Sequence, residues 1–246
     1  MTAKRPLTPE RFAQGRTFAE YLDYIGTPEN LARESGWWLG RERRDLSGII
    51  RSWYERLRLS DAQAAAVRWL AAQPGGPAKI LAISEEWSSD CRRDLGIVSR
   101  LAEAGGLELR IFDRDGRTLG TGPRSDPAES PNADLVNAFL FERDGETFQS
   151  IPVIVVYSAR FVELHRHVER PALYVKHRDK VVAAMQAARP GESRERAWER
   201  FMDEWRALQQ GPFFTLWASA TADEILSALY ERLIATGGAA GETPAR

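Results

Sequence analysis

The chain has 246 residues, of which 43% are hydrophobic and 28% charged, a composition that excludes a disordered or fibrous protein. Its 34 lysines and arginines nearly balance its 35 aspartates and glutamates. The formal charge of -1 creates no overall positive field, so we expect neither nucleic acid nor a membrane surface as a partner.

Particular residues exclude further classes of protein. The longest apolar runs, such as residues 151–157, are far shorter than the roughly 20 residues that span a bilayer. The first residues contain no apolar signal core, so the expected location is cytoplasmic. Cys91 is the single cysteine and permits no internal disulfide. With only three histidines beside it, we also expect no structural metal.

Helices are predicted for the first part of the chain. Two sets of apolar residues follow helical spacing, namely Phe18, Tyr21, Leu22 and Ile25, and then Leu46, Ile49, Ile50, Trp53 and Leu57. An alanine-rich helix follows Ser60 and runs to about Leu70. The Pro-Gly-Gly-Pro sequence at 74–77 is a strong helix breaker. We therefore expect residues 1–76 to form a helical extension packed on the core that follows, as one structural unit.

The pattern changes to alternating strands and helices after residue 77. Short apolar runs predict buried strands, while longer periodic segments predict helices. The expected strands are 79–84, 107–112, 152–157 and 161–168, and the expected helices are 88–104 and 133–140. This order indicates an α/β fold in which helices cover both faces of a mixed sheet.

The chain returns to helical patterns beyond Pro171. Two apolar stripes are expected to lie in the core; they are Trp198, Phe201, Met202, Trp205 and Leu208, and Ile225, Leu226, Leu229 and Leu233. We interpret residues 77–235 as one domain with a helical insertion at about 171–210. Residues 236–246, rich in glycine and alanine, are expected to be a flexible tail.

A family resemblance rests on the turn between the first strand and its helix. This turn reads Ile-Ser-Glu-Glu-Trp-Ser-Ser-Asp-Cys and ends at Cys91. Together with residues 110–115 and 150–153, it resembles a bacterial branch of the thioredoxin-like proteins, whose active turn reads Trp-Cys-x-Asp-Cys. The resemblance covers most of residues 17–235 and implies a thioredoxin-like mixed sheet flanked by helices. It fails at Ser88, which stands where the attacking cysteine would be.

The loss of that cysteine changes the expected function. A dithiol cycle cannot run within this chain, because Cys91 alone remains. The resemblance implies a cleft at Ser88, Cys91 and Pro152 that binds a thiol compound, glutathione among them, or an extended peptide of a protein partner. If the protein is an enzyme, it is a monothiol oxidoreductase acting through Cys91. The alternative is a redox-inactive binding or scaffolding module.

Two roles are open to each of the candidate catalytic residues. Ser88 either caps the helix or, as in glutathione transferases, stabilises a bound thiolate. Cys91 falls on an apolar helical stripe and is then a buried, inert thiol. Its neighbours Arg92 and Arg93 would instead lower its pKa if the thiol were exposed.

The remaining candidates surround this cleft or lie near it. The resemblance implies that Trp87 and Asp90 contact the ligand and that the Ile151–Pro152 bond is cis. Arg114 is expected either to meet an acidic ligand or to lie in a surface turn. Two more groups are interpreted as solvated faces. The first is Glu163, His165 and His167, whose side chains could also bind a metal ion. The second is the arginines of residues 41–44.

Overall fold

The computed structural model describes residues 7–33, 43, 45–120 and 122–235. The first helices are α1 (Pro9–Ala13), α2 (Phe18–Tyr24), α3 (Pro28–Leu31), α4 (Ser47–Arg56) and α5 (Asp61–Ala71). The strands are β1 (Pro77–Ser84), β2 (Glu108–Asp113), β3 (Phe141–Arg143), β4 (Glu146–Phe148), β5 (Val153–Ser158) and β6 (Glu163–Val168). The later helices are α6 (Ser89–Gly105), α7 (Ala133–Ala138), α8 (Ala172–Gln186), α9 (Arg194–Gln210) and α10 (Pro212–Ala235).

Capping side chains fix where several helices begin. Thr17 and Glu20 form a reciprocal capping box at the start of α2, and Ser60 and Gln63 form another at α5. At its other end, α6 stops at Gly106, whose φ of 65° is a left-handed conformation that glycine adopts without strain. The expected helix after Ser60 and the expected helix 88–104 are confirmed to within one residue at their ends.

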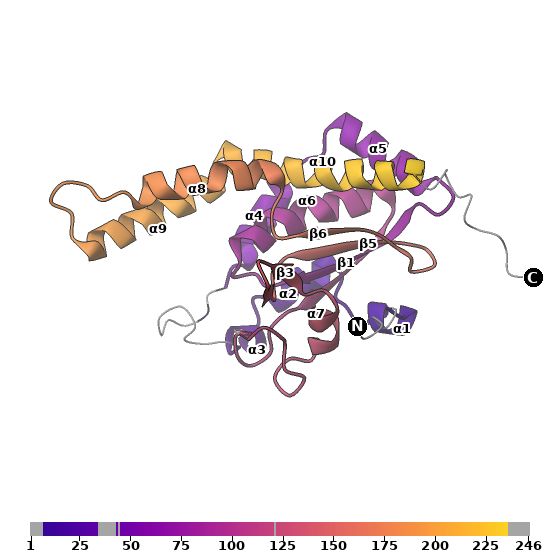
Figure 1. Cartoon of the computed structure of the whole chain (residues 1–246), viewed down its shortest axis with the longest axis horizontal. Coiled ribbons are helices and arrows are strands. Elements are labelled where there is room, and N and C mark those ends of the chain that lie inside the picture. Colours follow the sequence, from indigo (N-terminus) through magenta and orange to yellow (C-terminus); the bar gives the residue numbers. More distant parts are fainter. Residues whose placement is uncertain (1–6, 34–42, 44, 121, 236–246) are drawn as a thin grey trace, which may run out of the picture.

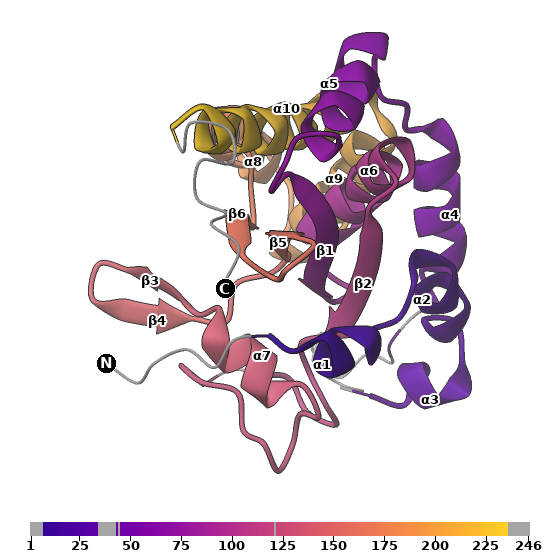
Figure 2. The same ribbon diagram turned by 90° about the vertical axis from the view of Figure 1, so that its right-hand side faces the viewer.

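The central sheet is mixed, with the strand order β2-β1-β5-β6. β1 and β2 are parallel, from the pair Lys79 and Glu108 to the pair Ser84 and Asp113. β5 is antiparallel to both of its neighbours, β1 and β6. The expected mixed α/β sheet flanked by helices is therefore present (Figures 1 and 2).

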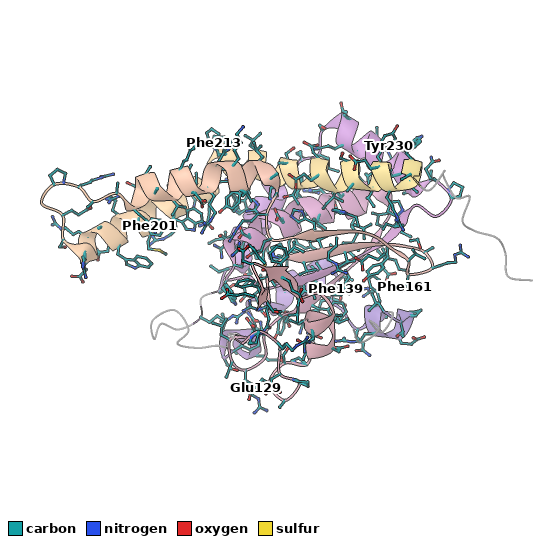
Figure 3. The ribbon with its side chains drawn as sticks, viewed as in Figure 1. Glu129, Phe139, Phe161, Phe201, Phe213 and Tyr230 are labelled. Carbon is teal, nitrogen blue, oxygen red and sulfur yellow. The ribbon has the colours of Figure 1, made fainter. Side chains whose placement is uncertain are left out.

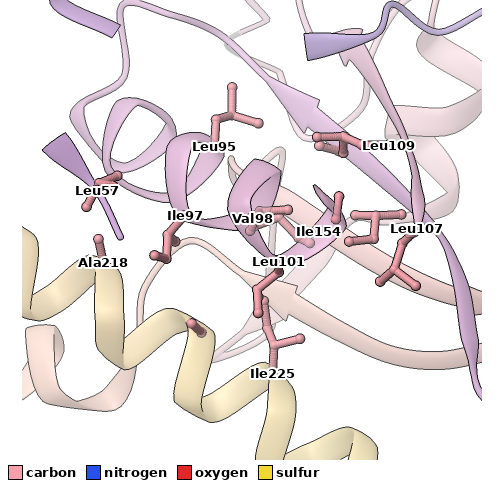
Figure 4. Close-up of a cluster of buried hydrophobic side chains, with 14 of the residues drawn as sticks. Leu57, Leu95, Ile97, Val98, Leu101, Leu107, Leu109, Ile154, Ala218 and Ile225 are labelled. Carbon is pink, nitrogen blue, oxygen red and sulfur yellow. The ribbon is translucent and has the colours of Figure 1, made fainter. Parts of the chain in front are cut away.

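Side chains alternate between the two faces of this sheet, as the pleat of a strand requires. Ile80, Ala82, Ile154 and Val156 point to the face covered by α6 and α10. Figure 4 shows Val98 and Leu101 of α6 near Ile154, with Ile225 of α10 alongside. The opposite face presents Leu81, Ile83, Val153 and Val155, which share a hydrophobic cluster with α1 and α7.

The N-terminal helices share the hydrophobic core of the sheet. α4 and α5 pack on α6, while α2 packs on β2 at the sheet edge. The ring of Trp53 in α4 lies 4.6 Å from that of Phe214 in α10. Helices α2, α4 and α5 of the extension are thus part of the same apolar cluster as α6 and α10.

A short hairpin, β3–β4, is present that the sequence analysis did not predict. Phe141 pairs with Phe148, and Asp144 and Gly145 form the turn with φ values of 53° and 80°. Asp-Gly is a favoured pair at such turns, which require two positive φ values. The predicted helix 133–140 ends early, at Ala138, before this hairpin begins.

The helices α8 and α9 form a second hairpin, which extends beyond the end of the sheet (Figure 1). Figure 3 shows Phe201 on this projecting part, and Trp198 beside it is 42% exposed. The aromatic rings of α9 contact one another, with 5.7 Å between Trp198 and Phe201. The prediction that this stripe lies in the core holds only in part, because Trp205 and Leu208 pack against the core cluster while Trp198 is exposed. The α10 stripe from Ile225 to Leu233 is buried as predicted.

Two other expectations concern the C-terminal tail and whether a helix is able to cross a membrane. The expected tail, 236–246, lies outside the described residues. Within the described part of the chain, none of the helices combines the length and apolar character needed to cross a bilayer.

Candidate functional site

The candidate site lies where β1 passes into α6, at the carboxyl end of two parallel strands. β1 ends at Ser84 and α6 begins at Ser89, so Glu85, Glu86 and Trp87 form the connecting turn. Ser88 is the N-cap residue, and its Oγ accepts a hydrogen bond from the backbone N–H of Cys91 at 3.4 Å. This is the capping role that serine favours at a helix start.

Cys91 is completely buried beneath this turn. It is 0% exposed and belongs to the apolar cluster that also contains Leu81 and Ile151. Its Sγ accepts a hydrogen bond from the backbone N–H of Glu85 at 3.5 Å. Burial raises the pKa of Cys91 to about 12, although its hydrogen bonds act in the opposite direction. The thiol form therefore dominates at neutral pH.

The two arginines that follow Cys91 are engaged elsewhere. Arg92 Nη1 donates to the backbone carbonyls of Glu86 and Trp87, at 2.8 Å each. Arg93 is turned toward the carboxylates of Asp90 and Asp94. Neither guanidinium hydrogen-bonds the sulfur in the described structure, although Arg92 interacts electrostatically with Cys91.

The Ile151–Pro152 peptide bond is cis, as the family resemblance implies. Ile151 is 6% exposed and lies in the same apolar cluster as Cys91, against which Trp87 also packs. The Pro152 carbonyl accepts a hydrogen bond from the backbone N–H of Glu169 at 2.8 Å. Trp87, Cys91 and Ile151 are thus brought together, with the sulfur on the inside.

Asp90 is part of a buried ion-pair network. One of its oxygens accepts a 2.6 Å hydrogen bond from Arg93, and the other accepts one from Arg170 at 2.9 Å. Arg93 also makes two hydrogen bonds of 2.8 Å to Asp94, and Thr221 of α10 donates to the same carboxylate at 2.9 Å. Asp90 therefore anchors α6 to its surroundings and does not offer a free carboxylate to a ligand.

Arg114 differs from both of its expected roles. It is 7% exposed, makes two 2.8 Å hydrogen bonds to Asp115, and donates to the Gln149 carbonyl at 3.0 Å. Its guanidinium also lies 5.1 Å from the centre of the Trp87 ring. Because these contacts occupy the guanidinium, Arg114 positions Trp87 and the neighbouring loop, and it lies neither in a surface turn nor in an open anion site.

Two carboxylates of the turn form a buried cluster to which the sequence analysis gave no role. Glu85 is 0% exposed and accepts hydrogen bonds from Arg33 at 2.7 Å and Arg43 at 2.8 Å. Glu86, 1% exposed, accepts two from Arg43 at 2.7 Å each and one from Asn30 at 2.8 Å. The side chain of Arg43 is only 5% exposed, which corrects its assignment to a solvated face.

Glu85 has the raised pKa that is typical of a catalytic acid, but its carboxylate is not accessible to a substrate. Burial and the neighbouring carboxylates of Asp113 and Asp115 raise the pKa of Glu85 to about 7, while Arg33 opposes the shift. Such values often mark general acids and bases. Here both carboxylate oxygens are engaged, one by the Asp115 N–H at 2.8 Å and the other by the arginines. We interpret Glu85 as a structural group.

One sequence signal for this cluster was available. Glu85 and Glu86 directly follow an apolar run that predicts a buried strand, and buried carboxylates are paired in folded proteins. Their partners Arg33 and Arg43 lie in the N-terminal extension, far away along the chain. The need for partners was therefore predictable, whereas their identity was not.

The histidines of β6 lie under α10 and do not form a solvated face. His165 and His167 pair with Val156 and Ile154, whose side chains face α6 and α10. His167 is 6% exposed, with its Nε2 3.7 Å from an Asp94 oxygen, and burial lowers the pKa of His165. Among the described residues, no group of three or more His, Cys, Asp or Glu side chains is arranged to hold a metal ion.

A pocket of about 330 Å³ lies next to the Ile151–Pro152 bond. We call it the arginine pocket; it is lined by Phe141, Arg143, Phe148, Ser150, Glu169, Arg170 and Arg178. These residues come from the β3–β4 hairpin, the segment before β5, the turn after β6, and α8. This pocket could not be predicted from the sequence, because two of its walls belong to elements whose positions the residue pattern does not determine.

Comparisons with known proteins place the chain in no family. No family model matches it, and no curated protein matches its sequence. One similar solved structure is an HIV epitope scaffold with 16% identity, a TM-score of 0.43, and coverage of 87% of this chain and 98% of its own. Another is a Pseudomonas aeruginosa protein of unknown function with 20% identity, a TM-score of 0.40, and coverage of 78% and 99%. At these TM-scores, neither neighbour indicates a function.

Proposed function

We propose that the chain is a thioredoxin-like binding protein that performs no thiol–disulfide chemistry. Three features support the thioredoxin-like assignment: the mixed sheet with helices on both faces, the helix that begins at Ser88, and the cis bond before Pro152. Fold alone does not determine function, so the argument rests on the state of the residues in the turn. The expected cytoplasmic location is kept as part of this proposal.

The buried state of Cys91 carries the redox-inactive part of the proposal. Thiol–disulfide exchange requires attack by a thiolate on a disulfide sulfur that can reach it. Cys91 is 0% exposed, and burial raises its pKa to about 12. Both conditions for attack are therefore unmet in the folded chain, which favours the binding module over the monothiol oxidoreductase.

Ser88 does not replace the missing cysteine in this proposal. A serine hydroxyl needs a neighbouring base to become a nucleophile. Within the described residues, no histidine, lysine or carboxylate hydrogen-bonds its Oγ, which accepts from the Cys91 N–H. The transferase-like role, in which Ser88 stabilises the thiolate of bound glutathione, has no supporting contact beyond this helix start.

The arginine pocket is the ligand site in this proposal. Ligand sites are typically concave and bring a few polar groups together, and this concave pocket, whose exposed surface is mostly polar, gathers three arginines. It adjoins the segment before Pro152, where the resemblance places bound peptide backbone. Ligand recognition is thereby separated from the buried sulfur of Cys91.

Exposure to glutathione disulfide tests the redox-inactive part. Because Cys91 is the single cysteine, any mixed disulfide detected by intact-mass spectrometry lies on it. We expect no adduct on the native chain and complete modification in denaturant, with Cys91→Ala as the blank in both conditions. A native adduct that forms as fast as the unfolded one would establish the monothiol function instead.

A further inference from the structure

We propose that the arginine pocket binds a small ligand through carboxylate or phosphate oxygens, held chiefly by Arg143 and Arg178. This inference rests on the proposed function and specifies the chemistry of its ligand. Guanidinium groups present paired N–H donors whose geometry matches both kinds of oxyanion. The pocket of about 330 Å³ has room for a small molecule.

The three arginines of the pocket differ in how strongly they are already engaged. Arg170 is held by Asp90 at 2.9 Å and lies 3.6 Å from Glu169. Arg178 forms an ion pair with its exposed neighbour Asp179 at 3.1 Å, and exposed pairs of this kind are weak. Within the described residues, Arg143 has no carboxylate within ion-pair distance and lies 5.2 Å from the Phe148 ring centre. Both also interact electrostatically with Glu169, but they are less strongly engaged than Arg170 and can turn to a bound anion.

One carboxylate, that of Glu169, lies in the pocket wall and competes with a bound anion for the arginines. The Glu169 side chain is 29% exposed; burial raises its pKa, while Arg170, Arg143 and Arg178 oppose that shift. Its backbone N–H is fixed to the Pro152 carbonyl at 2.8 Å. Residue 169 also has a φ of 62°, a conformation rare outside glycine that surrounding contacts must hold in place.

The apolar part of the pocket comes from the unpredicted hairpin. Phe141 and Phe148 are directly paired across β3 and β4, and both line the cavity. The surface that the cavity exposes is nevertheless mostly polar, so it suits a compact ligand whose anionic oxygens meet the guanidiniums. The Ser150 hydroxyl adds one more hydrogen-bonding group at the side nearest the cis bond.

Calorimetric titration with two simple probes tests this inference at constant ionic strength. Inorganic pyrophosphate represents phosphate ligands, and glutarate represents dicarboxylates. We expect saturable binding of at least one probe, and the tighter one identifies the type of oxyanion. Arg143→Gln and Arg178→Gln are each expected to raise the Kd about tenfold, which corresponds to about 1.4 kcal/mol.

The matched control is Arg206→Gln, which removes the same charge from an exposed position of α9. It is expected to leave the Kd unchanged, and melting temperatures of all three variants verify that they fold. Absence of saturable binding by the wild type, or equal weakening by Arg206→Gln, would overturn the oxyanion assignment. Neither result changes what the glutathione-disulfide test says about Cys91, so either proposal can be contradicted without the other.

Discussion

Replacing Arg93 by methionine is expected to lower the free energy of unfolding by about 3–5 kcal/mol. Arg93 is 0% exposed and donates to Asp90 at 2.6 Å and twice to Asp94 at 2.8 Å. Its guanidinium also lies 4.5 Å from the Tyr174 ring centre and donates to the Glu169 carbonyl at 2.9 Å. Methionine leaves the fully buried Asp94 carboxylate without its cation, which is the costly step.

Urea unfolding of matched variants measures this loss. Arg206→Met removes an arginine that is 61% exposed and pairs with Asp203 on the same helix, so its effect is expected to be below about 1 kcal/mol. Adding Asp94→Asn to Arg93→Met is expected to recover part of the loss, because the unpaired charge is then removed. Equal effects of Arg93→Met and Arg206→Met would show that the buried network does not stabilise the fold.

Replacing Trp217 by alanine is expected to cost about 3–5 kcal/mol of folding free energy. Trp217 in α10 is 1% exposed, and its ring lies 4.7 Å from that of Tyr174 in α8. Its Nε1 donates to His177 Nδ1 at 3.3 Å. Alanine removes a large apolar area from the core and leaves a cavity where α8 and α10 meet.

Trp198 provides the control with the same residue type. It is 42% exposed on the projecting hairpin, so Trp198→Ala is expected to cost less than half as much as Trp217→Ala. Both variants are compared by urea unfolding monitored through circular dichroism in the far ultraviolet. Similar losses in the two variants would mean that the α8–α9 hairpin contributes to the core as fully as α10 does.

The contrast between these tryptophans shows what sequence periodicity determines. The spacing of Trp198, Phe201 and Trp205 correctly indicates one apolar face on a helix. What covers that face depends on where the helix leaves the domain, which the spacing does not encode. For α10, whose stripe contains Ile225 and Leu229, the expectation of burial is confirmed because the helix lies along the sheet.

The sequence predicted the structure best where a side chain contacts residues close to it in the chain. The start of α6 at Ser88 and its end at Gly106 follow from capping chemistry. The same chemistry does not reveal distant partners, such as Arg43 on Glu86 or Arg170 on Asp90. The β3–β4 hairpin, by contrast, carries a local signal in the Asp-Gly pair at residues 144–145, which favours a tight turn between two strands.

The arginine pocket could not be predicted from the sequence, for a related reason. Its cationic side chains come from β3 and, farther along the sequence, from the turn after β6 and the α8 helix that follows it directly. Each arginine alone resembles an ordinary surface residue. Only the placement of the β3–β4 hairpin beside the start of α8 brings Arg143 near Arg178, so the candidate ligand site emerges from tertiary structure.

The alkylation rate of Cys91 as a function of pH tests most directly the central claim that this thiol is inert. Iodoacetamide reacts with the thiolate, so the rate reports both the pKa and the access of the sulfur. With a pKa of about 12 and no exposed surface, the native thiol is expected to stay unmodified through about pH 10. In denaturant, the same cysteine should react with a midpoint near the ordinary value of about 8.5. Rapid native alkylation with a midpoint below that value would contradict the claim and restore the monothiol oxidoreductase.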